Sequence, residues 1–130
     1  MLEERKGDVL LVDDEPDLVQ LVALRLQSAG YRVEVAYDGE EALQQVKKSK
    51  PDLVILDLML PKLDGYKVCR FLKFDERTRG IPVLIFTARA QAEDMTLAME
   101  CGADAYLTKP FEAKALLQKV AELLGVEKKL

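Results

Sequence analysis

Apolar residues follow two different spacings along this chain. Short, largely apolar runs are typical of strands that are buried on both faces of a parallel sheet. Five such runs occur, at residues 8–13, 32–36, 52–57, 82–87 and 104–108. Each is followed by a longer segment in which apolar residues recur every three or four positions, the spacing of a helix with one buried face. These helical segments lie at residues 16–29, 39–48, 65–74, 91–100 and 112–124.

The first helical segment shows the pattern most clearly. Leu18, Val22 and Leu26 fall on one apolar stripe. Pro16 stands where proline favours the start of a helix, and Gly30 lies just past the end of the stripe, a common position for glycine. Helix ends are therefore marked by local sequence as well as by spacing.

Strict alternation of strands and helices predicts an α/β fold. We expect a doubly wound, five-stranded parallel sheet, covered by helices on both faces and connected by right-handed crossovers. The 130 residues suit one domain, 1–130, with its core at about 7–124. We expect no second, output domain in this chain.

Composition narrows the classes of function. The chain contains no His, which excludes catalysis by a Ser/His/Asp or Cys/His set and excludes a phosphohistidine carrier. Its formal net charge is −4 and its basic residues are scattered, so we expect no direct binding to nucleic acid. Apolar stretches fall far short of the roughly 20 residues of a membrane span, which favours a cytoplasmic protein that does not enter the membrane. Cys69 and Cys101 are expected to be reduced core thiols on helices.

The chemistry that remains centres on carboxylates at the ends of predicted strands. Asp13 and Asp14 end the first strand, and Asp57 ends the third within an otherwise apolar run. In doubly wound sheets, ligands bind outside the carboxyl ends of the strands. Three acids converging there would repel one another unless a cation entered, and Mg²⁺ prefers such oxygen ligands. With the hydroxyl of Thr87 and the ammonium of Lys109, they describe a site for phosphoryl transfer to a carboxylate.

Four segments carry a resemblance to a known family. LLVDDEPD, LVILDLMLPKLDG, PVLIFTA and GADAYLTKPF, in this order, resemble the receiver domain of bacterial two-component response regulators. The likeness covers about residues 7–124. It implies a flavodoxin-like (βα)5 fold with strand order 2-1-3-4-5.

The resemblance also implies a role for each site residue. Asp57 would be the phosphoacceptor, and Mg²⁺ would bind Asp57, Asp14 directly, Asp13 largely through water, and the backbone carbonyl of Met59. Phosphoryl oxygens would be bound by Thr87 and Lys109, and the peptide between Lys109 and Pro110 would be cis.

A conformational switch is implied as well. Phosphorylation would draw Thr87 inward, and Tyr106 would turn from exposed to buried. The face formed by residues 91–100, 104–108 and 112–124 would then change shape. Met59 and Arg89 occupy positions that tune the rate of dephosphorylation in the family, and Ala88 should leave the phosphoryl site open.

Partners and activity follow from the same resemblance. The phosphoryl donor would be a sensor histidine kinase or a phosphotransfer protein, and the output would be a downstream protein target. A homodimer through the helices at 91–100 and 112–124 is a further expectation, although Ala105 stands where many dimerising relatives carry Asp. The chain would catalyse only its own phosphorylation and dephosphorylation, and is otherwise not an enzyme.

Three other functions fit the predicted architecture. A pseudo-receiver would bind partners without phosphorylation, but the acid set is intact. An aspartate-nucleophile phosphatase would usually carry a second acid two residues after the nucleophile, where this chain has Met59. A flavin-binding electron carrier would need a phosphate-binding loop after the first strand, where DDEPD would repel phosphate.

Overall fold

The protein's structure is a computed structural model that describes residues 6–89 and 91–125. Five strands and five helices alternate along these residues, in agreement with the predicted order. Their bounds are β1 Asp8–Val12, α1 Pro16–Ser28, β2 Arg32–Ala36, α2 Gly39–Ser49, β3 Leu53–Leu56, α3 Gly65–Phe74, β4 Val83–Thr87, α4 Ala92–Glu100, β5 Ala105–Thr108 and α5 Ala113–Leu124.

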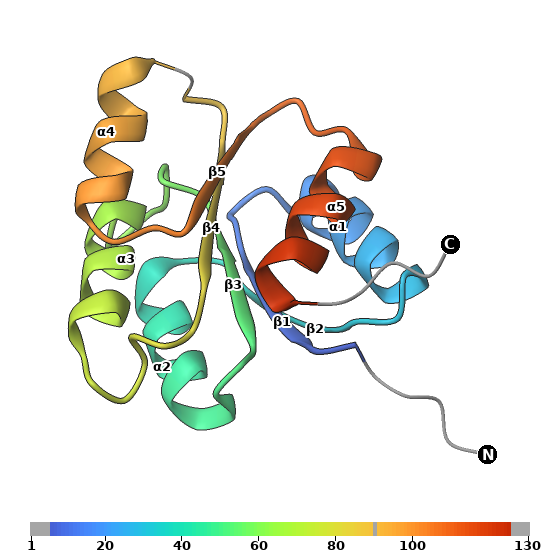
Figure 1. Cartoon of the computed structure of the whole chain (residues 1–130), viewed down its shortest axis with the longest axis horizontal. Coiled ribbons are helices and arrows are strands. Elements are labelled where there is room, and N and C mark those ends of the chain that lie inside the picture. The colour runs from blue at the N-terminus through green and yellow to red at the C-terminus, as the bar shows by residue number, and fades with distance from the viewer. Residues whose placement is uncertain (1–5, 90, 126–130) are drawn as a thin grey trace.

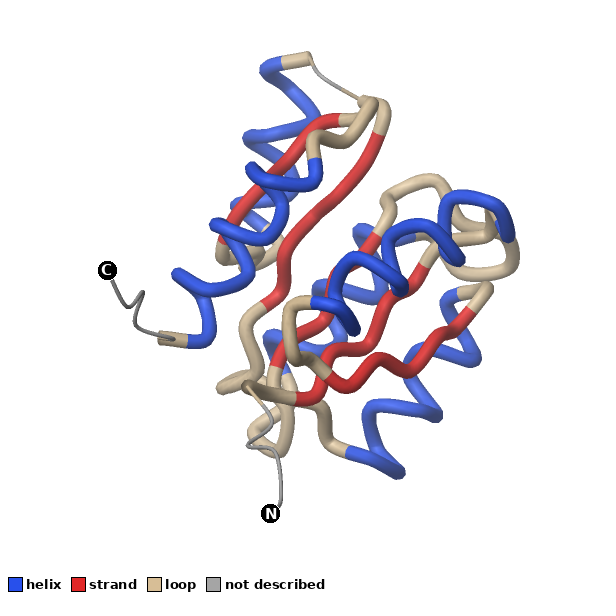
Figure 2. The backbone as a smooth tube through the Cα atoms, turned by 90° about the vertical axis from the view of Figure 1, so that its right-hand side faces the viewer, coloured by secondary structure: helices blue, strands red, loops and turns tan. Residues whose placement is uncertain are grey.

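The strands form one parallel sheet in the order β2-β1-β3-β4-β5, which confirms the predicted topology. Helices α2, α3 and α4 lie against one face, while α1 and α5 lie against the other (Figure 1). Figure 2 shows the same helices on both sides of the sheet in a view turned by 90°. Val12 at the end of β1 pairs with Leu56 at the end of β3, so these strands finish at the same level. The residues that follow them are thereby brought together.

Two apolar cores, one on each face, hold the layers together. Successive residues of a strand contact opposite cores because their side chains alternate. Val54 and Leu56 of β3 belong to the core under α2, α3 and α4, whereas Leu53 and Ile55 belong to the core under α1 and α5. All four are fully buried. Burial on both faces explains why the run is continuously apolar in the sequence.

The strand ends differ slightly from those expected. The sequence predicts strands at 8–13 and 52–57, which include Asp13 and Asp57, but β1 ends at Val12 and β3 at Leu56. The backbone N–H of Asp13 still donates to Ala36, and that of Asp57 donates to Val12. These acids are thus the first residues beyond the sheet, where a carboxylate can meet a polar partner instead of the apolar layer.

The two cysteines are buried and form no disulfide. Cys69 lies in α3 as expected, whereas Cys101 is the residue just after α4 rather than within a helix. The Sγ atom of Cys69 is 3.6 Å from the carbonyl oxygen of Cys101. Residues far apart in the sequence are therefore neighbours in the fold. Burial raises the pKa of the Cys69 thiol to about 12, which keeps this thiol protonated and unreactive.

Within residues 6–89 and 91–125, no helix combines the length and apolar content needed to cross a membrane.

Candidate functional site

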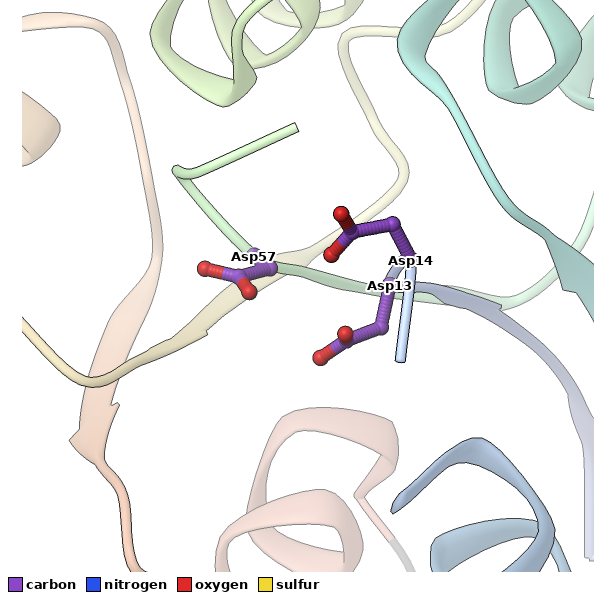
Figure 3. Close-up of side chains that lie close together, drawn as sticks. All are labelled: Asp13, Asp14 and Asp57. Carbon is purple, nitrogen blue, oxygen red and sulfur yellow. The ribbon is translucent and has the colours of Figure 1, made fainter. Parts of the chain in front are cut away.

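Three carboxylates meet at the carboxyl ends of β1 and β3. Asp13, Asp14 and Asp57 each offer an oxygen atom, and these atoms all lie within 4.8 Å of one another (Figure 3). Asp13 and Asp57 are 2% and 4% exposed, whereas Asp14 is exposed to solvent. The predicted convergence of the acids is therefore present in the fold. An all-oxygen set of this kind, open on one side, fits a hard divalent cation such as Mg²⁺.

Lys109 joins this cluster from the loop after β5. Its Nζ atom donates to Asp13 Oδ2 at 2.8 Å, to Asp57 Oδ2 at 3.0 Å and to Glu15 Oε1 at 3.3 Å. Burial disfavours the charge on Lys109, but the hydrogen bonds to Asp13 and Asp57 outweigh it and raise the pKa of Lys109. The side chain is therefore a fixed cation next to the proposed phosphoacceptor.

The Asp13 carboxylate is held at an energetic cost. Burial raises the pKa of Asp13 above its ordinary value of 3.8, even though Lys109 and the backbone N–H of Glu15 both favour the charged form. A carboxyl group whose pKa is raised by folding destabilises the fold at neutral pH and ceases to do so as the pH falls through that pKa. A cation bound beside Asp13 would favour its charged form and so reduce this destabilisation.

Thr87 ends the neighbouring strand β4. It is fully buried, and its carbonyl oxygen accepts a hydrogen bond from the backbone N–H of Lys109 at 2.8 Å. In the described part of the chain, its hydroxyl makes no hydrogen bond to Asp57 or to Lys109, and accepts instead from the Arg89 N–H at 3.5 Å. The expected cis peptide between Lys109 and Pro110 is present. Thr87 thus ends the strand next to β3, and in this structure its hydroxyl makes no hydrogen bond to Asp57.

Tyr106 of β5 is half-buried and packs against the core beneath α2, α3 and α4. Its hydroxyl donates to the carbonyl oxygen of Arg89 at 2.6 Å. Burial raises the pKa of Tyr106 to about 12, which keeps the hydroxyl available as a donor. The backbone after Thr87 is therefore fastened to β5.

Two further side chains, which sequence reasoning missed, fasten the same segment to the helices. Asp94 of α4 forms an ion pair with Arg89 at 3.5 Å and accepts a hydrogen bond from the Tyr66 hydroxyl of α3 at 3.0 Å. The Arg89 guanidinium is thereby held at α4 rather than over the acids. No sequence motif marks Tyr66 or Asp94, because their meeting depends on how α3 and α4 pack.

Met59 supports Asp57 through its backbone. Its N–H donates to Asp57 Oδ1 at 3.1 Å, while the residue as a whole is 54% exposed. Because Lys109 contacts Oδ2, the two oxygen atoms of Asp57 have different partners. The role of the Met59 carbonyl as a metal ligand remains a prediction.

Gly65 is a third residue that sequence reasoning missed. It begins α3 directly after Asp64, whose side chain accepts from the Lys67 N–H, and its own N–H donates to Leu58. A Cβ atom at Gly65 would lie 2.3 Å from the carbonyl oxygen of Asp57 and 2.5 Å from Leu58 Cα. The start of α3 therefore rests directly on the backbone that presents Asp57, and the Asp-Gly pair was the available signal.

Gly65→Ala is expected to lower the free energy of unfolding by at least about 1–3 kcal/mol, the usual cost of overpacking. The added methyl meets backbone atoms, which cannot rotate away, so Asp57 should also be displaced and its phosphorylation slowed. Urea unfolding would measure the first effect. Gly80→Ala is the matched control, because nothing lies within 4 Å of a Cβ there. Equal stability of the two variants would contradict this account of Gly65.

The sequence of this chain is similar to proteins of one known family. The sequence model of the response regulator receiver domain matches residues 9–121. The DNA-binding dual master transcriptional regulator RpaA of Synechocystis is 47% identical over 116 residues, which cover 89% of this chain and 48% of the relative. The alkaline phosphatase synthesis transcriptional regulatory protein PhoP of Bacillus subtilis is 44% identical, with the same coverage of both chains. The chain spans about half the length of these curated relatives.

Solved structures show the same likeness. The chemotaxis response regulator CheY4 of Vibrio cholerae matches with a TM-score of 0.85 and 32% identity, covering 90% of this chain and 98% of that one. The receiver domain of a sensor histidine kinase from Pseudomonas aeruginosa, with a magnesium ion coordinated in its active-site cleft, also has a TM-score of 0.85 and 32% identity, over 92% of this chain and 98% of that one.

Proposed function

Because this chain belongs to the response regulator receiver domain family, we propose that it is a switch controlled by phosphorylation of Asp57. The donor would be a sensor histidine kinase or a phosphotransfer protein. The observation that carries this proposal is the position of Asp57, within 4.8 Å of two other acids and 3.0 Å from the Lys109 ammonium. A nucleophilic carboxylate, ligands for a divalent cation and a fixed positive charge are the groups that this transfer needs.

The chain's own residues hold the reacting group in place. Met59 holds Oδ1 of Asp57 and Lys109 holds Oδ2. One of these oxygens would form the new bond to phosphorus, while the bond from phosphorus to the donor nitrogen breaks and its electron pair leaves with that nitrogen. Lys109 is placed to pair with a phosphoryl oxygen. Mg²⁺, bound by Asp13, Asp14 and Asp57, would supply further positive charge at the phosphoryl oxygens.

Mg²⁺ is expected to stabilise the unphosphorylated protein. Binding only the folded state at a hundredfold excess over the dissociation constant would add about 2.7 kcal/mol to the free energy of unfolding. Asp14→Asn should remove most of that gain. The Asp14 side chain is exposed and makes no hydrogen bond or ion pair within residues 6–89 and 91–125, so its replacement should leave the fold intact.

Thermal or urea unfolding with and without Mg²⁺ would measure this gain. Asp17→Asn, which changes an exposed acid in the first turn of α1, is the control and should keep the full gain. An unchanged unfolding midpoint in the presence of Mg²⁺, or a full gain in Asp14→Asn, would count against this metal site.

The phosphoryl signal would reach a partner through the segment after Thr87. An aspartyl phosphate adds charge and acceptor oxygens, which would draw the Thr87 hydroxyl toward Asp57. The Arg89 carbonyl would then move relative to the Tyr106 hydroxyl that now binds it. Phosphorylation favours the active state only to the extent that the aspartyl phosphate makes more favourable contacts in that state than in the inactive one. The face formed by α4, β5 and α5 would change and control a protein target, or a homodimer.

The relatives leave part of the proposal open to test. RpaA is described as DNA-binding, but this chain covers 48% of it. Three statements stay predictions. They are that the chain itself does not bind nucleic acid, that all of 1–130 is one receiver domain, and that the chain acts in the cytoplasm. The relatives are named as transcriptional regulators rather than enzymes. Turnover of outside substrates is not part of the proposal.

The proposal is tested by incubating the protein with acetyl phosphate and reading its intact mass before the adduct hydrolyses. One phosphoryl adduct, formed with Mg²⁺ and absent with a chelator, is expected. No adduct under conditions that label a known receiver domain would contradict phosphorylation from small donors. Incubation with phosphorylated histidine kinase would then separate a strictly kinase-dependent receiver from a pseudo-receiver.

A further inference from the structure

Helix α3 exposes two large aromatic side chains on the surface of the protein. Phe71 is 59% exposed and Phe74 is 69% exposed. The whole chain contains four Phe, so half of them lie exposed on one helix. Residues three apart on a helix are neighbours on its surface. The pair therefore forms one apolar feature, outside the cores of the domain.

These aromatic residues line a hollow between α2 and α3. The two helices lie side by side on the face of the sheet opposite α1 and α5 (Figure 1). The hollow measures about 940 Å³, and its apolar lining comes from Leu43 of α2 and from Phe71, Leu72 and Phe74 of α3. A concave, mainly apolar surface of this size accommodates several side chains of a binding partner.

The rim of the hollow is basic. Lys47 of α2 and Lys67 and Arg70 of α3 line it, and all three are exposed. None of them forms an ion pair with a carboxylate of the described residues, and α3 contains no acid. Arg70 lies over the Phe74 ring at 5.8 Å, which keeps its charge beside the aromatic pair.

The acidic groups near the hollow offset only part of this charge, since three basic residues and one acid, Asp75, line it. Asp75 lines it, but its carboxylate pairs with Arg77 at 3.0 Å. Glu40 and Glu41 of α2 lie in the first turn, at the opposite end of that helix from Lys47. A basic rim is therefore a local departure from a chain whose net charge is −4.

We propose that the α2–α3 hollow is a docking site for an acidic, amphipathic peptide segment of a partner protein. Apolar side chains of that segment would enter between Leu43, Phe71 and Phe74. Its carboxylates would pair with Lys47, Lys67 and Arg70, since complementary charge at the rim sets specificity and speeds association. Exposed aromatic and Arg side chains are the residues on which such interfaces most depend.

Other occupants fit these observations less well. Single-stranded nucleic acid needs a charged groove that follows its backbone together with stacking surfaces, whereas here the basic residues surround a single hollow that Asp75 also lines. An anionic membrane surface is bound by a broad apolar face that enters it, whereas in the apolar lining of this hollow Phe71 and Phe74 are strongly exposed, Leu43 is half-buried and Leu72 is buried. In a second copy of this chain, the acidic segment with exposed apolar side chains is α4, which already belongs to the proposed output face, and the sedimentation experiment below tests that occupant.

This surface is separate from the proposed phosphoryl switch. Asp57, Thr87 and Lys109 lie at the carboxyl ends of the strands, and none of them lines the hollow. The output face of α4, β5 and α5 does not contribute to it either. A partner could therefore bind here whether or not Asp57 is phosphorylated, and this inference does not depend on the proposed function.

The test uses a displayed library of random 12-residue peptides, selected for binding to the immobilised full chain. Enriched peptides should carry a negative net charge and two or more large apolar residues. Their affinity would be measured by fluorescence polarisation with wild-type protein and with Phe71→Ser and Lys67→Glu/Arg70→Glu. Each variant is expected to bind at least about tenfold more weakly, the loss typical of removing a central contact.

Matched controls change similar residues elsewhere. Leu24→Ser alters a 58% exposed apolar residue of α1, on the other face of the sheet. Lys48→Glu alters an exposed Lys of α2 that does not line the hollow. Both should keep wild-type affinity, and all variants should give the wild-type unfolding midpoint in urea.

Several outcomes would overturn the proposal. One is a selection that enriches no peptide, and another is enrichment of peptides without negative charge. A third is peptide affinity that is unchanged in Phe71→Ser and in Lys67→Glu/Arg70→Glu. Binding of a single-stranded oligonucleotide, or of vesicles of anionic phospholipid, with the same dependence on these residues would assign the hollow to that ligand instead. Sedimentation that shows a dimer lost only in the hollow variants would assign it to a second copy of this chain.

Discussion

Asp57→Asn is expected to abolish the phosphoryl adduct completely. The amide has no negative oxygen with which to attack phosphorus, while its size and shape match those of the carboxylate. Asp57 is 4% exposed, and it is the acid that lies between the Met59 N–H and the Lys109 ammonium. Intact mass after incubation with acetyl phosphate and Mg²⁺ measures the result.

Asp17→Asn serves as the control for this experiment, because it removes an exposed acid of α1 and should leave the adduct unchanged. Hydroxylamine should release the phosphoryl group from the wild-type protein, since it attacks the acyl carbon of an aspartyl phosphate. An adduct of normal yield on Asp57→Asn would place the phosphoacceptor elsewhere and would refute the assignment of Asp57.

Lys109→Gln is expected to have the largest effect on stability. Its removal would leave Asp13 and Asp57, both nearly buried, without their shared cation. Removing one partner of a buried ion pair costs about 3–5 kcal/mol, because the remaining charge is uncompensated. Urea unfolding without Mg²⁺ would measure the loss, and added Mg²⁺ should recover part of it. The variant should also transmit the phosphoryl signal poorly.

The loss of stability in Lys109→Gln should depend on pH. Lys109 lowers the pKa of Asp13, so its removal should raise that pKa further above the ordinary 3.8. The variant's deficit is then greatest near neutral pH and shrinks as the pH falls through the raised pKa of Asp13. On the alkaline side, the titration of Lys109 itself leaves its stabilising contribution intact up to its ordinary pKa of 10.5, and the contribution is lost as the pH rises through its raised pKa.

Lys119→Gln is the matched control, because Lys119 forms a partly exposed pair with Glu122 at 3.3 Å within α5. Such a pair contributes about 0–1 kcal/mol. The double variant Asp57→Asn/Lys109→Gln should recover stability relative to Lys109→Gln, since one uncompensated carboxylate is gone. A small deficit for Lys109→Gln that does not change with pH would contradict the role given to Lys109.

The sequence by itself determined the fold class and the approximate place of the acids. Strands buried on both faces must be continuously apolar, and helices with one buried face must repeat at their own period, so spacing alone separated them. Asp57 could be found in the same way, because one carboxylate in an apolar run must lie where that run leaves the core. Family resemblance then supplied the strand order and the roles of the individual residues.

Only the tertiary structure decided which side chains meet. Lys109 reaches Asp13 across 96 residues, and Tyr66 of α3 meets Asp94 of α4, because helix packing and strand order bring them together. The closeness of Gly65 to the Asp57 backbone depends on how the start of α3 packs, which the neighbours of Gly65 in the chain do not show. Phe71 and Phe74 belong to a helix with apolar residues on several sides, so spacing could not tell which ones face solvent. Local pattern depends on neighbours in the chain, whereas a site or a surface depends on neighbours in space.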